Sequence, residues 1–125
     1  MGQKLGRISR LLNSQQSRTA FIKAKLFVLV PAQIRALRLK SVNPPMPHQR
    51  DLARESKLHQ SRISMFETPG AANMTIETIA KIAAALRVGV VIQFVPMREM
   101  VEWENAFSIA GFEVERLDKG RDLIG

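Results

Sequence analysis

The sequence predicts a small, mainly α-helical protein with a short β-strand and a further helix near its C-terminal end. The strongest observation is the helical spacing of apolar residues over 75–87, which two shorter helical patterns at 48–55 and 60–67 precede. The third observation is a run of β-branched and aromatic residues at 90–95, bounded by glycine and proline, which is typical of a strand. At 125 residues and 46% hydrophobic content, the chain suits one domain with modest extensions.

Three segments divide the chain. Residues 1–17 contain basic but no acidic side chains, and no apolar signal-peptide stretch follows, so we expect a flexible basic arm. An organellar transit sequence is the alternative. Residues 18–88 carry most of the helical patterns, and residues 89–125 carry the strand and the last helix, which we expect to serve dimerisation or to bind a partner.

Proline residues set the expected limits of the first two helices. A short helix is expected to begin near Ser17, and a second helix should have Pro31 in its first turn, where the missing amide costs nothing. The run VNPPMP at 42–47 then interrupts any helix, because proline lacks a donor and biases the preceding residue toward extended geometry. A rigid loop is expected there.

The two short helices at 48–55 and 60–67 are expected to be joined by the tight turn Ser56-Lys57-Leu58. Helices of this length are not stable alone, so they must pack on a third element. That element is the helix starting after Thr75, which is a good N-cap residue. Its apolar stripe consists of Ile76, Ile79, Ile82, Ala83 and Leu86.

A single strand at 90–95 needs a partner. Residues 26–30, LFVLV, are the other strand candidate in this chain, and the alternative is the same segment of a second subunit across a two-fold axis. An amphipathic helix at 97–107 follows, with its acidic residues facing outward.

The net charge of +8 is unevenly distributed. Residues 1–62 hold 13 lysines and arginines against two acidic residues, Asp51 and Glu55, whereas residues 63–125 hold six against nine. This asymmetry predicts that the basic half of the chain forms a face that binds a polyanion and that the other half does not bind it. The alternative is that the positive charge only keeps the protein soluble.

Catalytic and metal chemistry find little support in the sequence. There is no cysteine, no glycine-rich phosphate loop, and the two histidines, His48 and His59, open separate helices. We therefore expect no enzyme, no cofactor and no metal. The apolar runs fall short of the ~20 residues that span a bilayer, so a soluble, cytoplasmic protein is expected.

The central motif resembles a known family. QRDLARESKLHQSRISMFE followed by TIETIAKIAAAL is similar to the Xre family of Cro/repressor-type helix-turn-helix regulators, over about residues 31–87. The resemblance rests on Gln-x-x-Leu-Ala in the first short helix, Gln-Ser-x-Ile-Ser-x-x-Glu in the second, and Ile-Ala-x-Ala-Leu in the third. It implies a lambda-repressor-like fold of about five helices, with residues 18–88 as the DNA-binding domain.

The resemblance also implies roles for individual residues. The 60–67 helix would enter the major groove of double-stranded DNA, and the helix before it would cross the backbone. Arg38 and Glu67 would form a structural ion pair. The expected base-reading residues are Gln60, Ser61, Ser64 and Met65, and the expected phosphate-binding residues are Gln49, Arg50, Lys57, His59 and Arg62.

Three departures from the family pattern carry expectations of their own. Lys57 stands where the family usually has glycine at a position of positive φ, so local strain or a different turn is expected. The proline-rich connection is several residues longer than usual. His48 and His59 replace the usual Ser or Thr N-cap, and histidine is the poorer cap.

The resemblance implies a transcriptional repressor that binds a palindromic operator as a homodimer, in a bacterial or phage-encoded setting and associated with the nucleoid when bound. The alternative is a HipB-like antitoxin, which would autoregulate its operon and mask a toxin protein with the acidic, weakly patterned residues 99–125. An activator is not separable from these two by sequence.

Overall fold

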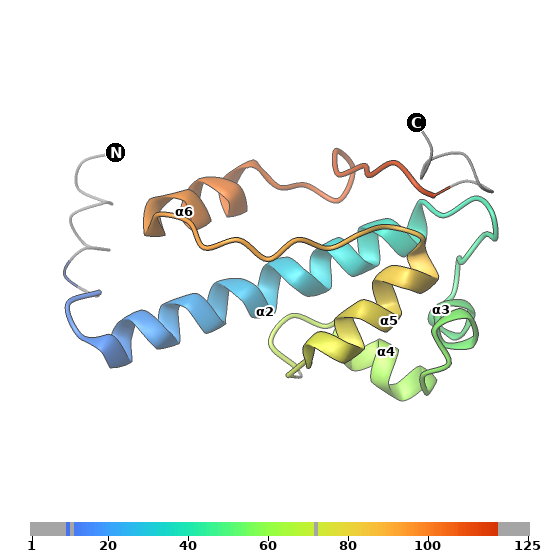
Figure 1. The fold of residues 1–125 in the computed structure, drawn as a ribbon, viewed down its shortest axis with the longest axis horizontal. Helices are drawn as coiled ribbons and strands as arrows, with labels where there is room; N and C mark the ends of the chain where they lie inside the picture. The colour runs from blue at the N-terminus through green and yellow to red at the C-terminus, as the bar shows by residue number, and fades with distance from the viewer. Residues whose placement is uncertain (1–9, 11, 72, 118–125) are drawn as a thin grey trace.

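The computed structural model describes residue 10 and residues 12–71 and 73–117, and it is mainly helical, as predicted. These residues form five α-helices and no β-sheet (Figure 1). No helix in the described ranges is long and apolar enough to cross a membrane. The helices are α2 (Gln15–Leu39), α3 (Gln49–Ser56), α4 (Gln60–Phe66), α5 (Ile76–Leu86) and α6 (Met97–Ala106).

Helix α2 is the longest element; α5 and α6 pack against it, and α3 packs against α4 and α5. The α3, α4 and α5 helices gather at its C-terminal half, and α6 lies along its N-terminal half (Figure 1). The core therefore sits where α3, α4 and α5 meet the second half of α2. It consists of Ile34, Leu37, Met46, Leu52, Ala53, Ile63, Phe66, Ile82 and Leu86.

The predicted break at Pro31 is wrong, because α2 continues through this residue as one helix. Proline lacks an N–H, so the carbonyl of Phe27, one turn earlier, has no donor within the helix. The backbone N–H of Gly70, from the loop after α4, donates to the Phe27 oxygen at 2.9 Å instead. The helix also starts earlier than expected, with Ser14 as the N-cap accepting from the Ser17 N–H at 3.0 Å.

The predicted strand at 90–95 is not confirmed, because these residues form no ladder within the described chain. The intrachain partner considered for it, 26–30, lies inside α2, where its backbone groups are already bonded. A strand requires a neighbouring backbone, and the part of the chain that the structure describes offers none.

The proline-rich loop between α2 and α3 is present, with a cis peptide bond between Asn43 and Pro44. Its Met46 side chain is 1% exposed and belongs to the core. The loop is therefore held by burial of a large apolar side chain as well as by its prolines.

The predicted start of α5 is confirmed, because the Thr75 hydroxyl accepts from the Thr78 N–H at 3.1 Å. The apolar stripe is correct from Ile82 onward, but Ile76 is 72% exposed. It lies in the first turn, outside the packed part of the helix. Thr78 is buried instead.

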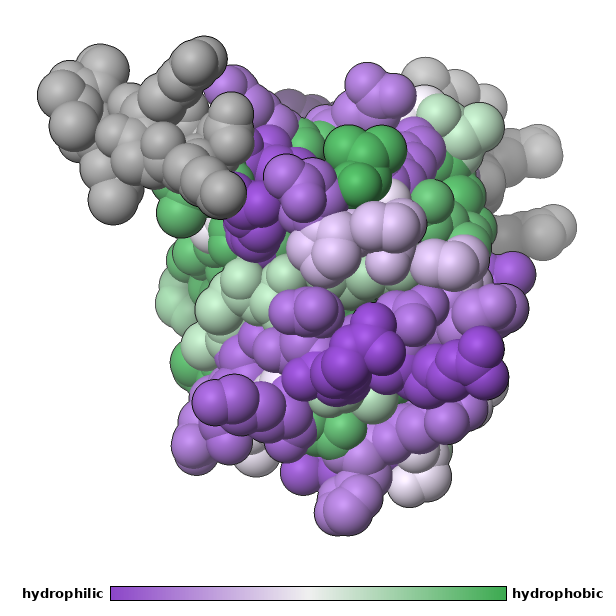
Figure 2. Space-filling model, turned by 90° about the vertical axis from the view of Figure 1, so that its right-hand side faces the viewer, coloured by the Kyte–Doolittle hydropathy of each residue, from purple (hydrophilic) through white to green (hydrophobic). Residues whose placement is uncertain are grey.

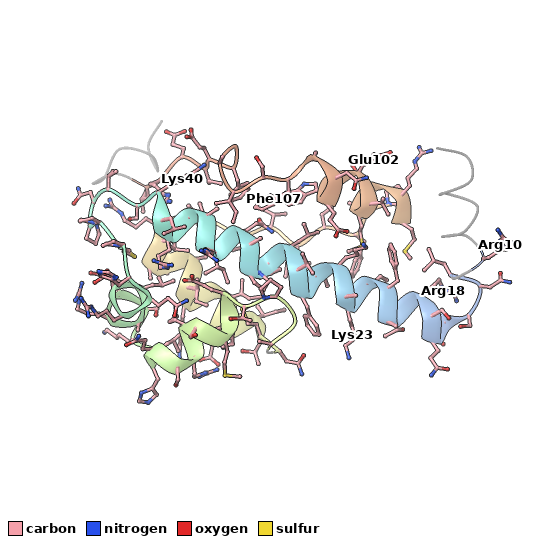
Figure 3. The ribbon with its side chains drawn as sticks, turned by 180° about the vertical axis from the view of Figure 1, so that it is seen from behind. Arg10, Arg18, Lys23, Lys40, Glu102 and Phe107 are labelled. Carbon is pink, nitrogen blue, oxygen red and sulfur yellow. The ribbon has the colours of Figure 1, made fainter. Side chains whose placement is uncertain are left out.

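The chain after α6 returns to the other end of the molecule (Figure 1). There Arg116 donates to the carbonyls of Leu86 at 3.0 Å and Leu37 at 2.5 Å, near the C-terminal ends of α5 and α2. Burial lowers the pKa of Arg116. Lys40 donates to the carbonyls of Ala110 and Phe112 (Figure 3 shows Lys40 at the end of α2). Two cations thus satisfy the free carbonyls of helix ends and of the returning segment.

The turn between α3 and α4 has the geometry expected from the family pattern. Lys57 adopts φ 60° and ψ 34°, the left-handed conformation, and its neighbour Leu58 donates its N–H to the Ala53 carbonyl at 3.1 Å. A residue with a β-carbon is strained in this conformation, whereas glycine is not.

We therefore predict that Lys57→Gly is about 1 kcal/mol more stable to unfolding than Lys57→Ala, since both variants lose the lysine side chain and only one keeps a β-carbon at positive φ. Urea denaturation of the two variants measures this difference. Equal stabilities would contradict the strain assigned to this turn.

Candidate nucleic-acid interface

Helix α4 separates buried from exposed side chains cleanly. Ile63 is fully buried and Phe66 is 3% exposed. With about 100° per residue, positions 60, 61, 64 and 65 fall together on the opposite side of the helix. Gln60, Ser61 and Met65 are exposed and Ser64 is half-buried. The structure therefore brings the four predicted base-reading residues onto one outward face.

The expected ion pair between α2 and the end of α4 is present and buried. Arg38 Nε donates to Glu67 Oε2 at 2.7 Å and Arg38 Nη2 donates to Oε1 at 3.0 Å. Both residues are 5% exposed. Arg38 Nη1 also donates to the carbonyls of Met46 and Pro47, at 3.0 and 2.9 Å. The guanidinium thus joins α2, the proline-rich loop and the C-cap of α4 at one point.

The start of α3 is held by a carboxylate that sequence reasoning missed. Asp51 Oδ2 accepts from the backbone N–H of His48 at 2.8 Å. This hydrogen bond, helped by nearby Arg54, lowers the pKa of Asp51 below its ordinary value. An acidic residue three positions after the N-cap is the local signal that could have revealed it.

Both histidines occupy N-cap positions, as the family resemblance implied: His48 precedes α3 and His59 precedes α4. The His59 imidazole makes no cap hydrogen bond and is exposed. Over the described ranges, no group of three or more His, Cys, Asp or Glu side chains could hold a metal ion.

Four of the predicted phosphate-binding residues lie in the first turn of α3, in the turn between α3 and α4, and in the first turn of α4. Arg50, Lys57, His59 and Arg62 are exposed, and none of them forms an ion pair with another described residue. The Arg62 guanidinium lies 5.3 Å from the centre of the Phe66 ring, a cation–π contact that limits its movement. The remaining predicted phosphate-binding residue, Gln49, is half-buried in the first turn of α3. Figure 2 views the molecule from the α3 side, and hydrophilic side chains dominate the lower part of that face.

The basic half of the sequence does not form a single face. Arg18 and Lys23 are exposed on the N-terminal half of α2, at the opposite end of the molecule from α3 (Figure 3). Lys25 forms an ion pair with Glu104 of α6. Of the predicted basic arm at 1–17, residues 1–9 and 11 lie outside the described residues, and residues 15–17 belong to α2.

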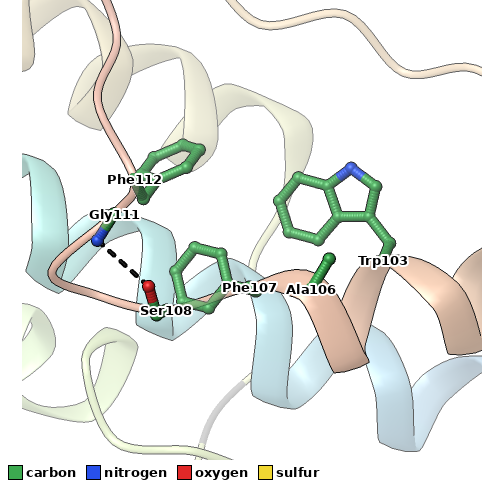
Figure 4. Close-up of a pocket in the computed structure, with 6 residues that line it drawn as sticks. All are labelled: Trp103, Ala106, Phe107, Ser108, Gly111 and Phe112. Carbon is green, nitrogen blue, oxygen red and sulfur yellow. Dashed lines mark hydrogen bonds between the residues drawn. The ribbon is translucent and has the colours of Figure 1, made fainter.

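A hollow lies between α6 and the segment that follows it. Trp103, Phe107 and Phe112 line it, together with Ala106, Ser108 and Gly111 (Figure 4). Their rings contact one another, with centroids 5.3 to 6.3 Å apart. The contacts of Trp103 and Phe107 with Phe112 hold α6 against the segment that follows it. No charged side chain lines the hollow.

Comparisons with protein-family models, curated proteins and solved structures found no match.

We predict that Glu67→Gln lowers the free energy of unfolding by about 3–5 kcal/mol, because it leaves the buried Arg38 charge without a counter-charge. The control is Glu77→Gln, which removes an exposed pairing with Lys81 at 3.6 Å and should cost less than about 1 kcal/mol. Chemical denaturation compares the two. Similar losses in both variants would show that the buried pair has no special role.

Proposed function

We propose that this protein is a sequence-specific DNA-binding transcriptional regulator of the helix-turn-helix type, similar to the Xre family, and that α4 is its recognition helix. The observation that carries the proposal is the division of α4 into a face fixed in the core and an outward polar face. The core face is held by Ile63, by Phe66 and by the Arg38–Glu67 pair at the helix end. A recognition helix needs this rigidity, because base edges are distinguished by the positions of hydrogen-bonding groups.

The outward residues suit base readout in the major groove. The carboxamide of Gln60 can bond adenine N6 and N7 in a bidentate way. Ser61 and Ser64 offer hydroxyl groups that donate or accept, and Met65 offers an apolar contact for a thymine methyl group. Gln60 is the first choice for a base reader because it lies at the N-terminal end of α4, the end that reaches the bases in this docking geometry.

The surrounding cations suit the phosphate backbone. Arg50, Lys57 and Arg62 are exposed and not neutralised by described acidic residues, so binding can release counterions from DNA. His59 and Gln49, at the starts of α4 and α3, complete the phosphate-binding set. These contacts position the protein without selecting a sequence.

One α4 helix spans only a few base pairs, so we propose a homodimer that binds a palindromic operator. Two recognition helices would then reach successive major grooves, about 34 Å apart. Such a dimer on a promoter obstructs polymerase, which makes repression the proposed outcome.

The base-reading and phosphate-binding roles predict different results for two neighbouring variants. Gln60→Ala should lose about 1–3 kcal/mol of discrimination at one base position, whereas Arg62→Ala should weaken binding to all sequences alike and lower the salt slope by about one. Titrations of a bound site and its single-base variants at several salt concentrations measure both quantities.

Helical circular dichroism is the control for folding in both variants, because Arg62 also contacts the Phe66 ring. The reverse pattern would mean that Arg62 reads a base and that Gln60 contacts phosphate. Wild-type affinity that stays constant between 50 and 200 mM salt would contradict DNA binding of this kind.

A further inference from the structure

We propose that Arg116 is a positioning residue for the recognition helix: it joins the C-terminal ends of α2 and α5, and this junction sets the direction in which α4 points. The role depends on the proposed function, in which α4 reads bases. Arg116 lies 30 positions from Leu86 and 79 positions from Leu37, the two residues whose carbonyls it contacts. Figure 1 shows the segment after α6 returning to these two helix ends.

Two helix ends meet at the half-buried guanidinium of Arg116. Its Nη1 donates at 3.0 Å to the carbonyl of Leu86, the last residue of α5, and its Nη2 donates at 2.5 Å to the carbonyl of Leu37, in the last turn of α2. Carbonyls at a helix C-terminus lack a partner within the helix and carry partial negative charge, so a cation is favoured there. The guanidinium therefore holds the two helices together at these ends.

A second set of hydrogen bonds runs in the opposite direction. Lys40, the C-cap of α2, donates from Nζ to the carbonyls of Ala110 at 2.8 Å and Phe112 at 2.6 Å. The Phe112 side chain also packs against the core. The 110–117 segment thus gives a cation to the helix ends and receives one from α2. These reciprocal contacts fix Arg116 in place.

Helix α4 is held from two sides that Arg116 joins. On one side, the Arg38–Glu67 pair ties the end of α4 to α2, and the Gly70 N–H ties the following loop to the Phe27 carbonyl of α2. On the other side, α3 packs against both α4 and α5. A change in the angle between α2 and α5 must therefore turn α4 or break one of these contacts.

The connection from Arg116 to α4 is short. Leu37, whose carbonyl accepts from Arg116, directly precedes Arg38 in the chain. Leu37 and Leu86 also pack in the same core as Ile63 of α4. Recognition requires a side chain to be held within about 0.5 Å and 10–20° of its productive position, so a small rotation of α4 is enough to misplace a base-reading group.

Two methionine variants test this role without DNA. Arg116→Met removes both hydrogen bonds and keeps an unbranched side chain, and Arg98→Met is the matched control. Arg98 is exposed on α6 and forms no ion pair with another described residue. Circular dichroism and urea denaturation define a temperature at which both variants are folded. NMR at that temperature should show shifted signals for Arg38 Nε–H and the α4 amides in Arg116→Met, and wild-type signals in the control.

A DNA site bound by the wild type tests the consequence for reading. Discrimination against single-base variants of that site should fall by about 2- to 30-fold in Arg116→Met, the range for substitutions that act through a packed network. The slope of log affinity against log salt should stay unchanged, because the phosphate contacts remain. A residue that only adds stability would not alter discrimination in a folded protein. Arg116→Lys, which can keep one hydrogen bond, should recover part of the loss.

Unchanged Arg38 Nε–H and α4 signals in folded Arg116→Met overturn the proposal, as does discrimination equal to that of the wild type. If Arg116→Met does not fold, Lys40→Met, which removes the opposite hydrogen bonds, takes its place with the same expected and contrary results. A wild-type protein that binds no DNA overturns the proposed function instead, and the NMR comparison still decides whether Arg116 sets the direction of α4.

Discussion

The buried contact between Arg38 and Glu67 is the constraint on which the proposed reading surface depends. Helix α4 has seven residues, too few to be stable alone, so its orientation must come from its neighbours. Ile63 and Phe66 hold its inner side, and Glu67 fixes its last turn to α2 through two hydrogen bonds. The same guanidinium satisfies the carbonyls of Met46 and Pro47, so the loop before α3 is positioned together with α4.

Helix α2 connects this surface to the rest of the molecule. The Gly70 N–H takes the place of the donor that Pro31 lacks, which ties the loop after α4 to the middle of α2. Arg116 and Lys40 hold the returning C-terminal segment at the ends of α2 and α5. These contacts hold the outward face of α4 and the segments around α2 in one arrangement. In the proposed dimer, the distance between the two recognition helices depends on this arrangement.

Local features were predictable from the sequence, and features that depend on distant partners were not. The positions of α3 and α4 and the Thr75 cap follow from residues within one turn of each site, whereas the left-handed Lys57 was expected only through the family resemblance. The continuity of α2 through Pro31 depends on Gly70, 39 positions away, and no local pattern reveals it. The strand predicted at 90–95 does not form within the described chain, because β-propensity describes a tendency to pair and the described chain supplies no partner. The Arg38–Glu67 pair was expected only through the family resemblance, since the two residues are 29 positions apart.

In the proposed function, two copies of α4 read a symmetric DNA site. Selection of bound sequences from random double-stranded DNA, followed by footprinting of the enriched site, tests this arrangement. We expect an inverted repeat whose half-sites lie about one helical turn apart, with protection centred on both major grooves. Recovery of sequences without enrichment, or of a site with a single unrepeated element, would contradict it.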